Sequence, residues 1–245
     1  MHFPDRTGQK IPQVTFKMRN DDKWESKTSD DIFKGKRIIL FALPGAFTPT
    51  CSSVHLPRYN ELYESFKANG IDDVMCLSVN DSFVLNEWKK SEHADNITML
   101  PDGNGEFSEK MGFLVDKAEL CFGKRSWRYS MVVQDGVIEK MFVEPEEEGD
   151  PYGASSAESM LTYLNPEAKS PPSIAIFTKE GCEYCSKAKR LLKDAKLPYD
   201  EMKLHDDFSI KTVKAISDST KLPQVFMDGK RIGGADDLEK FLRSL

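Results

Sequence analysis

Two cysteine-containing stretches carry residue types that can perform redox chemistry. The sequence PGAFTPTC over residues 44–51 ends in Cys51 and stands between an apolar run and a helical stretch. A second sequence, Cys-Glu-Tyr-Cys over residues 182–185, also follows an apolar run and opens a helix. A thiol in the first turn of a helix meets unpaired backbone N–H groups and the positive end of the helix dipole, which favour the nucleophilic thiolate. The sequence therefore predicts two reactive sulfur sites.

The chain has five cysteines, and an odd number would leave one thiol outside a closed set of structural disulfides. For a lone cysteine, burial as a small hydrophobic residue is the alternative to a reactive role. Cys182 and Cys185 alone make half a zinc site, and His205 is the one later Cys or His that could add to it. We therefore expect no metal site.

Composition restricts the classes of function. The 245 residues are 39% hydrophobic and 30% charged with a net charge of −6, which is ordinary for a soluble protein and argues against general nucleic-acid binding. No apolar run approaches the roughly 20 residues that span a bilayer, and the polar start of the chain does not resemble a signal peptide. We expect a cytoplasmic protein without a membrane or nucleic-acid partner.

A proline-rich stretch divides the chain. Three prolines with small and polar residues predict a linker at 165–172, between a domain at 1–164 and a smaller one at 173–245. The first part alternates apolar runs at 37–43, 74–79, 129–134 and 137–143 with helical stretches at 52–69, 83–92 and 107–111. This alternation is typical of an α/β sheet with helices on both faces. The acidic stretch 144–150 is expected to be a solvated loop.

The second part has the element order of a thioredoxin-like fold. Strands are expected at 174–177, 199–204, 222–228 and 230–232, and helices at 184–195, 209–217 and 236–244. The prediction for the whole chain is an α/β protein of two thioredoxin-like domains, the larger one first.

The spacing of Pro44, Thr48 and Cys51 fills the pattern Pro-x-x-x-Thr-x-x-Cys, which resembles the active-site loop of the peroxiredoxins. The string PGAFTPTCS, the nearby sequences 55–57 and 79–83, Trp88, and the run 128–136 are similar to the Prx5 subgroup. This resemblance covers residues 1–164 and implies a peroxidase domain.

The resemblance assigns a role to each matching residue. It implies that Cys51 attacks the peroxide and becomes a sulfenic acid. Thr48 would hydrogen-bond the thiolate and the peroxide, and Pro44 would shield the sulfur from water. Arg128 would hold the thiolate and polarise the peroxide, since fixed donors lower a barrier at which negative charge develops.

Several neighbouring residues offer alternatives. Arg125 competes with Arg128, but if the segment is a strand the two would point to opposite faces, and Arg128 directly precedes the Tyr-Ser-Met-Val-Val run. His55, at i+4 from Cys51, could form a catalytic pair with it, although packing or solvation on the helix is favoured. Cys121 or Cys76 could resolve the sulfenic acid, although neither has the flexible polar surroundings of a resolving cysteine.

Residues 172–245 resemble a glutaredoxin, through Thr178-Lys179, the Cys-x-Tyr-Cys sequence, the run 222–226 and the run 232–238. The resemblance implies that Cys182 is the nucleophile, Cys185 its buried partner and Pro223 a cis proline facing them. The implied glutathione contacts are Lys179, Tyr184, Leu222, Pro223, Gly234, Ala235 and Asp236. Glu183, Leu222 and Ala235 depart from the usual Pro, Val and Cys, and Glu183 disfavours a thiolate nearby. The Cys-Gly-Phe-Ser sequence typical of cluster-binding glutaredoxins is absent.

Together the resemblances imply a glutathione-dependent thiol peroxidase acting on hydrogen peroxide and alkyl hydroperoxides. Glutathione would be the reducing co-substrate, regenerated by glutathione reductase, and no cofactor would be tightly bound. The first domain implies a homo-oligomer, a dimer or tetramer. The nine residues 165–173, if extended, reach roughly 28 Å, so delivery within or between subunits stays open. The alternatives are a peroxide-sensing thiol–disulfide relay, and a general disulfide or deglutathionylating enzyme, against which the peroxiredoxin-like residue set argues.

Overall fold

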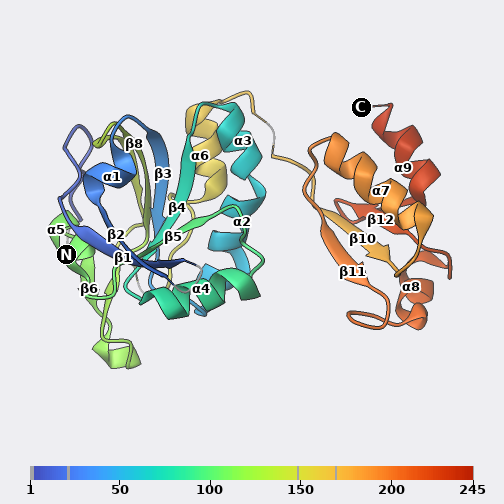
Figure 1. Cartoon of the computed structure of the whole chain (residues 1–245), viewed down its shortest axis with the longest axis horizontal. Helices are drawn as coiled ribbons and strands as arrows, with labels where there is room; N and C mark the ends of the chain where they lie inside the picture. The colour runs from blue at the N-terminus through green and yellow to red at the C-terminus, as the bar shows by residue number, and fades with distance from the viewer. Residues whose placement is uncertain (1–2, 21–22, 148, 169, 245) are drawn as a thin grey trace. The chain divides into compact units, whose positions relative to one another are not determined.

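The computed structural model of the chain describes residues 3–20, 23–147, 149–168 and 170–244 (Figure 1). The chain divides into two compact units, Met1–Lys169 and Ser170–Leu245. This division falls inside the segment 165–172 that the sequence assigns to a linker. Among the described residues, no helix has the length and apolar character needed to cross a membrane.

A five-stranded mixed sheet forms the centre of the first unit. Its strands lie in the order β5-β4-β3-β8-β9, with β3, β4 and β5 parallel and β8 antiparallel to both of its neighbours. The bounds are β3 Arg37–Ala42, β4 Asp73–Ser78, β5 Thr98–Pro101, β8 Tyr129–Gln134 and β9 Val137–Val143. The central strand β3 is an unbroken apolar run because both of its faces are covered.

Helices cover both faces of this sheet, as the sequence predicts. Alternate residues of β3 enter two separate cores, Ile38 and Leu40 on one face and Ile39 and Phe41 on the other. Residues of α1 (Ser29–Phe33) and α5 (Glu106–Met111) fill the first core. The second core is built by α2 Leu56–Glu61, α3 Tyr63–Ala68, α4 Ser82–Ser91 and α6 Ala157–Leu164. Figure 1 shows α2, α3 and α6 gathered on one side of the strands.

The sequence prediction lacks β5, α1 and α6, and it also lacks two antiparallel pairs and a short turn. The pairs and the turn are β1 Thr15–Asn20 with β2 Lys23–Thr28, β6 Leu114–Asp116 with β7 Lys124–Ser126, and the 3-10 turn Ala118–Leu120. The prediction missed β2 because it is polar and almost entirely exposed, and it missed β6 and β7 because three residues are too few to show a pattern.

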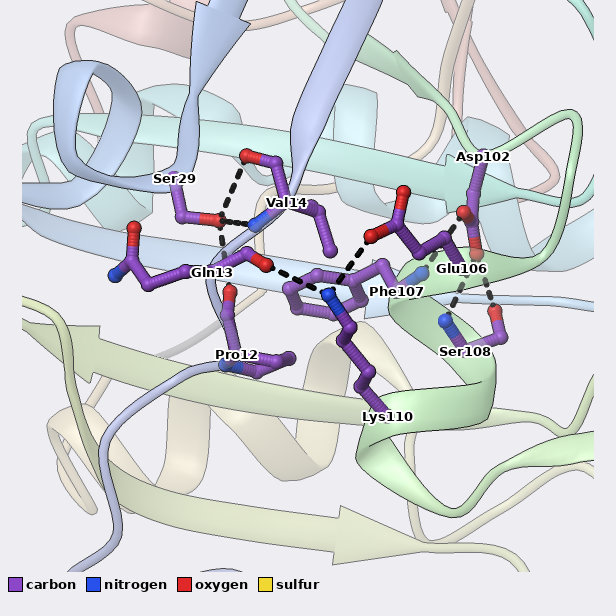
Figure 2. A network of polar contacts seen from close by, with 9 residues as sticks. All are labelled: Pro12, Gln13, Val14, Ser29, Asp102, Glu106, Phe107, Ser108 and Lys110. Atoms are coloured by element: carbon purple, nitrogen blue, oxygen red, sulfur yellow. Dashed lines mark hydrogen bonds and ion pairs between the residues drawn. The ribbon is translucent and has the colours of Figure 1, made fainter.

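A polar network fastens the N-terminal segment to α5 (Figure 2). Lys110 Nζ donates to the carbonyl of Gln13 at 3.0 Å and to Glu106 Oε1 at 2.7 Å. The buried Asp102 carboxylate accepts hydrogen bonds from the backbone N–H groups of Phe107 and Ser108, which caps the first turn of the helix. Burial raises the pKa of Asp102, although these bonds oppose the shift.

The second unit is a four-stranded sheet in the order β11-β10-β12-β13, with β10 and β11 parallel and the other pairs antiparallel. Helices α7 and α9 pack on one face, and Phe177 meets Phe208 and Phe226 on the other. The bounds are β10 Ile174–Thr178, α7 Glu183–Asp194, β11 Asp200–Lys203, α8 Ile210–Ser217, β12 Gln224–Met227, β13 Lys230–Gly233 and α9 Ala235–Leu242. This order confirms the predicted thioredoxin-like fold.

Candidate active sites

Cys51 opens a π-helical turn, Cys51–His55, that continues into α2. The predicted single helix over 52–69 is therefore wrong in detail, since the chain forms this turn, α2 and α3 in succession. Pro57 has no N–H to donate in an α-helical pattern, and the Leu56 N–H instead reaches back five residues to the Cys51 carbonyl. Wide turns of this kind are frequent at functional sites.

A pocket of about 320 Å³ brings three of the predicted residues together. Pro44, Thr48 and Arg128 line it, while Cys51 is 0% exposed in the turn that follows Thr48. The rest of the lining is mostly apolar: Pro49, Thr50, Lys117, Leu120, Phe122, Trp127, Gly149, Asp150 and Pro151. Thr48 Oγ1 donates to the Gly45 carbonyl at 2.8 Å, which orients the hydroxyl within the loop.

Arg128 lies immediately before β8 and is 1% exposed. Its Nη1 is 2.9 Å from His55 Nδ1 and its Nη2 is 2.5 Å from Asp150 Oδ1. Its Nε has no hydrogen-bond partner among the described residues. Burial opposes the charge of Arg128, but the neighbouring Cys51 sulfur and Asp150 carboxylate leave its pKa raised overall. The guanidinium thus has a donor to spare beside Cys51.

Arg125, the competing arginine, faces backbone instead. Its Nε donates to the Phe122 carbonyl at 3.0 Å and its Nη1 to the Val79 carbonyl at 3.4 Å. A Cβ added at Gly45 would lie 3.0 Å from Arg125 Nη1, so the loop before Cys51 approaches this side chain closely. Arg125 therefore supports the loop rather than the sulfur.

The acidic stretch 144–150 is mostly exposed, as the sequence predicts, but two of its carboxylates have fixed partners. Glu144 is 3% exposed and accepts hydrogen bonds from the N–H groups of Gly153, Ala154 and Ser155 at 2.7–3.2 Å. Asp150, from the same stretch, pairs with Arg128. The surrounding acidic residues hid these two, because composition cannot separate an anchored carboxylate from solvated ones.

Two further side chains outside the predicted site hold the turn around Cys51. Asn80 Oδ1 accepts the Ala46 N–H at 3.1 Å and the Ser78 hydroxyl at 2.7 Å, which fixes the loop. Trp88 Nε1 donates to Ser52 Oγ at 2.8 Å, directly after Cys51. Asn80 and Trp88 both lie in segments that the sequence marks by resemblance, but their contacts have no local sequence signal.

The two remaining cysteines of the first unit differ in environment. Cys76 is fully buried on β4, and burial raises its pKa well above the ordinary value, with the nearby Cys51 adding to the shift. Cys121 is exposed, directly after the turn Ala118–Leu120. Both are free thiols, so the structure does not pair either with Cys51.

The second site lies at the start of α7. Cys182 caps this helix and forms a disulfide with Cys185, whose N–H donates to the Cys182 sulfur at 3.1 Å. Cys185 is 2% exposed, one turn into the helix. The Leu222–Pro223 peptide bond is cis, as the resemblance implies, and the Leu222 carbonyl oxygen lies 3.9 Å from the Cys182 sulfur.

The other predicted glutathione contacts lie in different surroundings: a cleft, the exposed surface and the start of α9. Lys179 and Cys182 line a cleft of about 1030 Å³, and Tyr184 is 60% exposed. Gly234 caps α9, and Ala235 and Asp236 form its first turn. An unexpected ion pair joins Asp236 to Lys187 at 2.8 Å, and this contact lowers the pKa of Asp236.

Gly233 occupies a position that no other residue fits. Its φ is +123°, and a Cβ there would lie 2.4 Å from the Asp237 carboxylate, which accepts the Gly234 N–H.

Among the described residues, no group of three or more His, Cys, Asp or Glu side chains could hold a metal ion.

Comparison with known families identifies both units. The Redoxin family model matches residues 6–161, and the Glutaredoxin family model matches residues 174–232. The chain belongs to the peroxiredoxin family and carries a C-terminal glutaredoxin domain. It is a redox protein of the thioredoxin fold, and its family supports peroxide reduction and thiol oxidoreductase activity.

Similar proteins have the same organisation in whole or in part. Hybrid peroxiredoxin hyPrx5 of Haemophilus influenzae is 57% identical over 96% of this chain and 97% of its own length. A peroxiredoxin of Synechocystis sp. is 56% identical over 64% of this chain and 90% of its own. Reduced Prx3 of Vibrio vulnificus, solved with hydrogen peroxide, is 37% identical with a TM-score of 0.61, and covers 64% of this chain and 98% of its own. These last two match only as far as a peroxiredoxin domain would.

Proposed function

We propose that this protein is a glutathione-dependent thiol peroxidase in which Cys51 reduces hydrogen peroxide and alkyl hydroperoxides. The observation that carries this proposal is the position of Arg128, buried beside the Cys51 sulfur with an unpartnered Nε donor. The apolar lining of the adjoining pocket suits the carbon chain of an alkyl hydroperoxide.

The chemistry of the first step follows from these groups. The Cys51 thiolate attacks one peroxide oxygen, the O–O bond breaks, and the leaving hydroxide or alkoxide takes up a proton. The sulfur becomes a sulfenic acid. Arg128, with Thr48 at the pocket wall, stabilises the negative charge on the leaving oxygen, while Pro44 and the apolar lining limit water.

Recycling uses glutathione and the second site. A glutathione thiol attacks the sulfenic sulfur and releases water, which leaves a mixed disulfide on Cys51. The Cys182 thiolate then takes the glutathionyl group and frees Cys51. A second glutathione attacks this adduct and leaves as oxidised glutathione, which glutathione reductase returns to the pool. Cys185 supplies a side route through its disulfide with Cys182.

The residues proposed to hold glutathione lie in the second unit, and their roles are inferred from its similarity to glutaredoxins. The backbone of Leu222 beside Pro223 would pair with the tripeptide as an added strand, and Lys179 would meet its glycyl carboxylate. The start of α9 at Gly234–Asp236 would take the γ-glutamyl end, and Tyr184 would cover the adduct. Because Asp236 is paired with Lys187, glutathione would have to compete with this lysine.

The arrangement of domains fits this cycle. We assign residues 1–164 to peroxide chemistry and 173–245 to glutathione chemistry, with 165–172 as the tether. A tether raises the effective concentration of the second site to the millimolar range where it spans the distance. A homo-oligomer, a dimer or tetramer, would allow transfer between subunits as well as within one.

A coupled assay tests the proposal. NADPH oxidation is followed with peroxide, glutathione and glutathione reductase for the wild type, Cys51→Ser, Cys182→Ser and Cys185→Ser. We expect near-total loss for the first two variants and partial retention for the third, while Cys121→Ser, changed at an exposed thiol, serves as the control.

Three results would revise the proposal. Fast turnover without Cys51 contradicts a peroxidase role. Wild-type turnover without Cys182 means that glutathione alone recycles Cys51. Peroxide-dependent disulfides on added client proteins, with little NADPH consumption, favour a sensing relay.

A further inference from the structure

His55 is a buried polar side chain that the steps above do not use. It is 0% exposed, one turn after Cys51, and its ring lies 5.0–5.4 Å from the rings of Phe41, Tyr59 and Tyr152. Its Nδ1 lies 2.9 Å from Arg128 Nη1. The histidine therefore touches the arginine rather than pairing with the cysteine.

The chemistry of this contact fixes the protonation of the ring. A guanidinium group only donates hydrogen bonds, so Nδ1 must accept and its proton must stay on Nε2. Burial lowers the pKa of His55 well below its ordinary value, and the charge of Arg128 lowers it further against an opposing contribution from the backbone of Ser155. The ring is thus neutral at physiological pH.

His55 and Asp150 each accept a hydrogen bond from one terminal nitrogen of Arg128. Nη1 is directed to the imidazole and Nη2 to the carboxylate, while the guanidinium lies 5.9 Å from the centre of the Tyr152 ring. Burial raises the pKa of Tyr152 to about 12, so this ring adds no charge. These contacts use two of the five N–H donors of the guanidinium, one on Nη1 and one on Nη2, and Nε is the nitrogen without a partner among the described residues.

We propose that His55 is a positioning residue that holds the Arg128 guanidinium with its free N–H directed at the reacting sulfur and peroxide. This inference rests on the proposed peroxidase function and deepens it. A neutral acceptor suits the task, because a second carboxylate at this place would neutralise the arginine further. A protonated histidine would turn two donors toward each other.

Packing alone is the competing explanation, since an aromatic ring fills this part of the core. The two explanations differ in what a substitution changes. A packing role predicts lost stability with equal effects on every reaction of Cys51. A positioning role predicts a selective loss in O–O cleavage, where Arg128 meets developing charge.

Two substitutions separate these explanations in the full-length reduced protein. Asn places an amide oxygen near the position of Nδ1, whereas Leu fills similar space without an acceptor. The rate constant of Cys51 oxidation by hydrogen peroxide is measured by stopped-flow tryptophan fluorescence. Alkylation of Cys51 by iodoacetamide, followed by mass spectrometry, measures a reaction that cleaves no O–O bond.

We expect His55→Leu to lower the peroxide rate constant about 10- to 100-fold and alkylation less than about 3-fold, as for a lost hydrogen bond to a charged group. His55→Asn should recover to within about 5-fold of wild type. In an Arg128→Ala background, His55→Leu should change the peroxide rate less than about 2-fold, because the two residues act through one contact.

Parallel losses in both reactions, equal behaviour of Leu and Asn, or an undiminished effect without Arg128 would each overturn the positioning role. If His55→Leu does not fold, His55→Gln replaces it, since its amide oxygen lies one carbon farther out and misses the Nδ1 position. Failure of wild-type Cys51 to react with peroxide would instead refute the peroxidase function itself.

Discussion

Arg128 carries a positive charge although its side chain is almost completely buried. A buried cation is tolerated when it is paired and hydrogen-bonded, and Asp150 and His55 meet both conditions. The Asp150 side chain is 40% exposed, so the ion pair joins a buried guanidinium to a carboxylate that solvent can reach. Two nitrogens of the arginine are therefore fixed, and in the proposed mechanism its remaining N–H donors serve the reaction.

The neutral state of His55 has a consequence for stability. In the unfolded chain a histidine takes up its proton near pH 6.5, whereas the pKa of buried His55 is far lower. Between these values the unfolded state binds more protons, so the free energy of unfolding decreases as the pH falls below about 6.5, by at most about 1.4 kcal/mol per pH unit. Above that pH the contribution is complete.

Urea unfolding at pH 7.5 and 5.5 measures this effect. All three tryptophans, Trp24, Trp88 and Trp127, lie in the first unit, so their fluorescence reports it alone. We expect His55→Asn to lessen the loss of stability between the two pH values. His93→Asn, at an exposed position, should retain it. Equal losses in wild type and His55→Asn would contradict a neutral buried histidine.

At the residue scale, sequence patterns lead to the reactive groups but not to their supports. Cys51 and Cys182 stand at helix starts after apolar runs, and Arg128 precedes a buried strand, so each has a local signal. His55 and Asp150 have none, because their roles depend on contacts across 73 and 22 residues of chain. Such contacts arise only when the sheet has formed.

At the element scale, the segment from β9 to α6 depends on one carboxylate. Glu144 collects three backbone N–H groups and the Ser155 hydroxyl, and it thereby shapes the loop that carries Asp150 and Tyr152 to Arg128. A carboxylate that accepts hydrogen bonds from several backbone N–H groups stabilises backbone that is neither helix nor strand. The orientation of the arginine is thus connected to an anchor at the end of β9.

Replacing this anchor should weaken both stability and catalysis. In Glu144→Gln the amide group would turn donors toward backbone N–H groups, and we expect the free energy of unfolding to fall by about 2–3 kcal/mol. We also expect the rate constant of Cys51 oxidation to fall several-fold as Asp150 loosens. Tryptophan-monitored urea unfolding and stopped-flow kinetics measure the two quantities.

The exposed Glu147 offers a matched control in the same loop. Glu147→Gln removes the same charge without removing backbone contacts, and it should leave both quantities unchanged. If both substitutions have the same effect, the charge of the loop matters rather than the anchor.

Elements are predicted best where burial imposes a pattern. Apart from β5, which was not predicted, the strands of both central sheets lie within a few residues of their predicted positions because continuous or alternating apolar residues mark them. The helix after Cys51 differs, since Pro57 disturbs its hydrogen bonds, and the β1–β2 pair was missed because its outer strand is polar. Irregular backbone near the site is where local patterns carry least information.

At the scale of the whole molecule, each unit has its own core and its own sulfur chemistry. The first unit has two cores, one on each face of its sheet, and the second has a separate one under α7 and α9. Units of this kind are able to fold alone. In the proposed cycle, the tether would add effective concentration rather than stability.

We expect the segments 1–169 and 170–245 to fold when produced separately. Mixed at equal micromolar concentrations, they should turn over peroxide with glutathione more slowly than the intact chain, and excess second unit should restore the rate toward millimolar concentrations. The coupled NADPH assay measures this dependence. Equal rates for the mixture and the intact chain at low concentration would mean that the tether contributes nothing.

The complete burial of Cys51 also affects how fast peroxide and glutathione can reach its sulfur. The free Cys51 thiol is 0% exposed next to a pocket of about 320 Å³, in a turn whose hydrogen bonds are already irregular. We expect a slim peroxide to arrive quickly, while a bulky tripeptide must wait for that turn to loosen. The persistence of the sulfenic acid, and hence its risk of over-oxidation, is then set by how often the backbone opens rather than by how much reductant the solution holds.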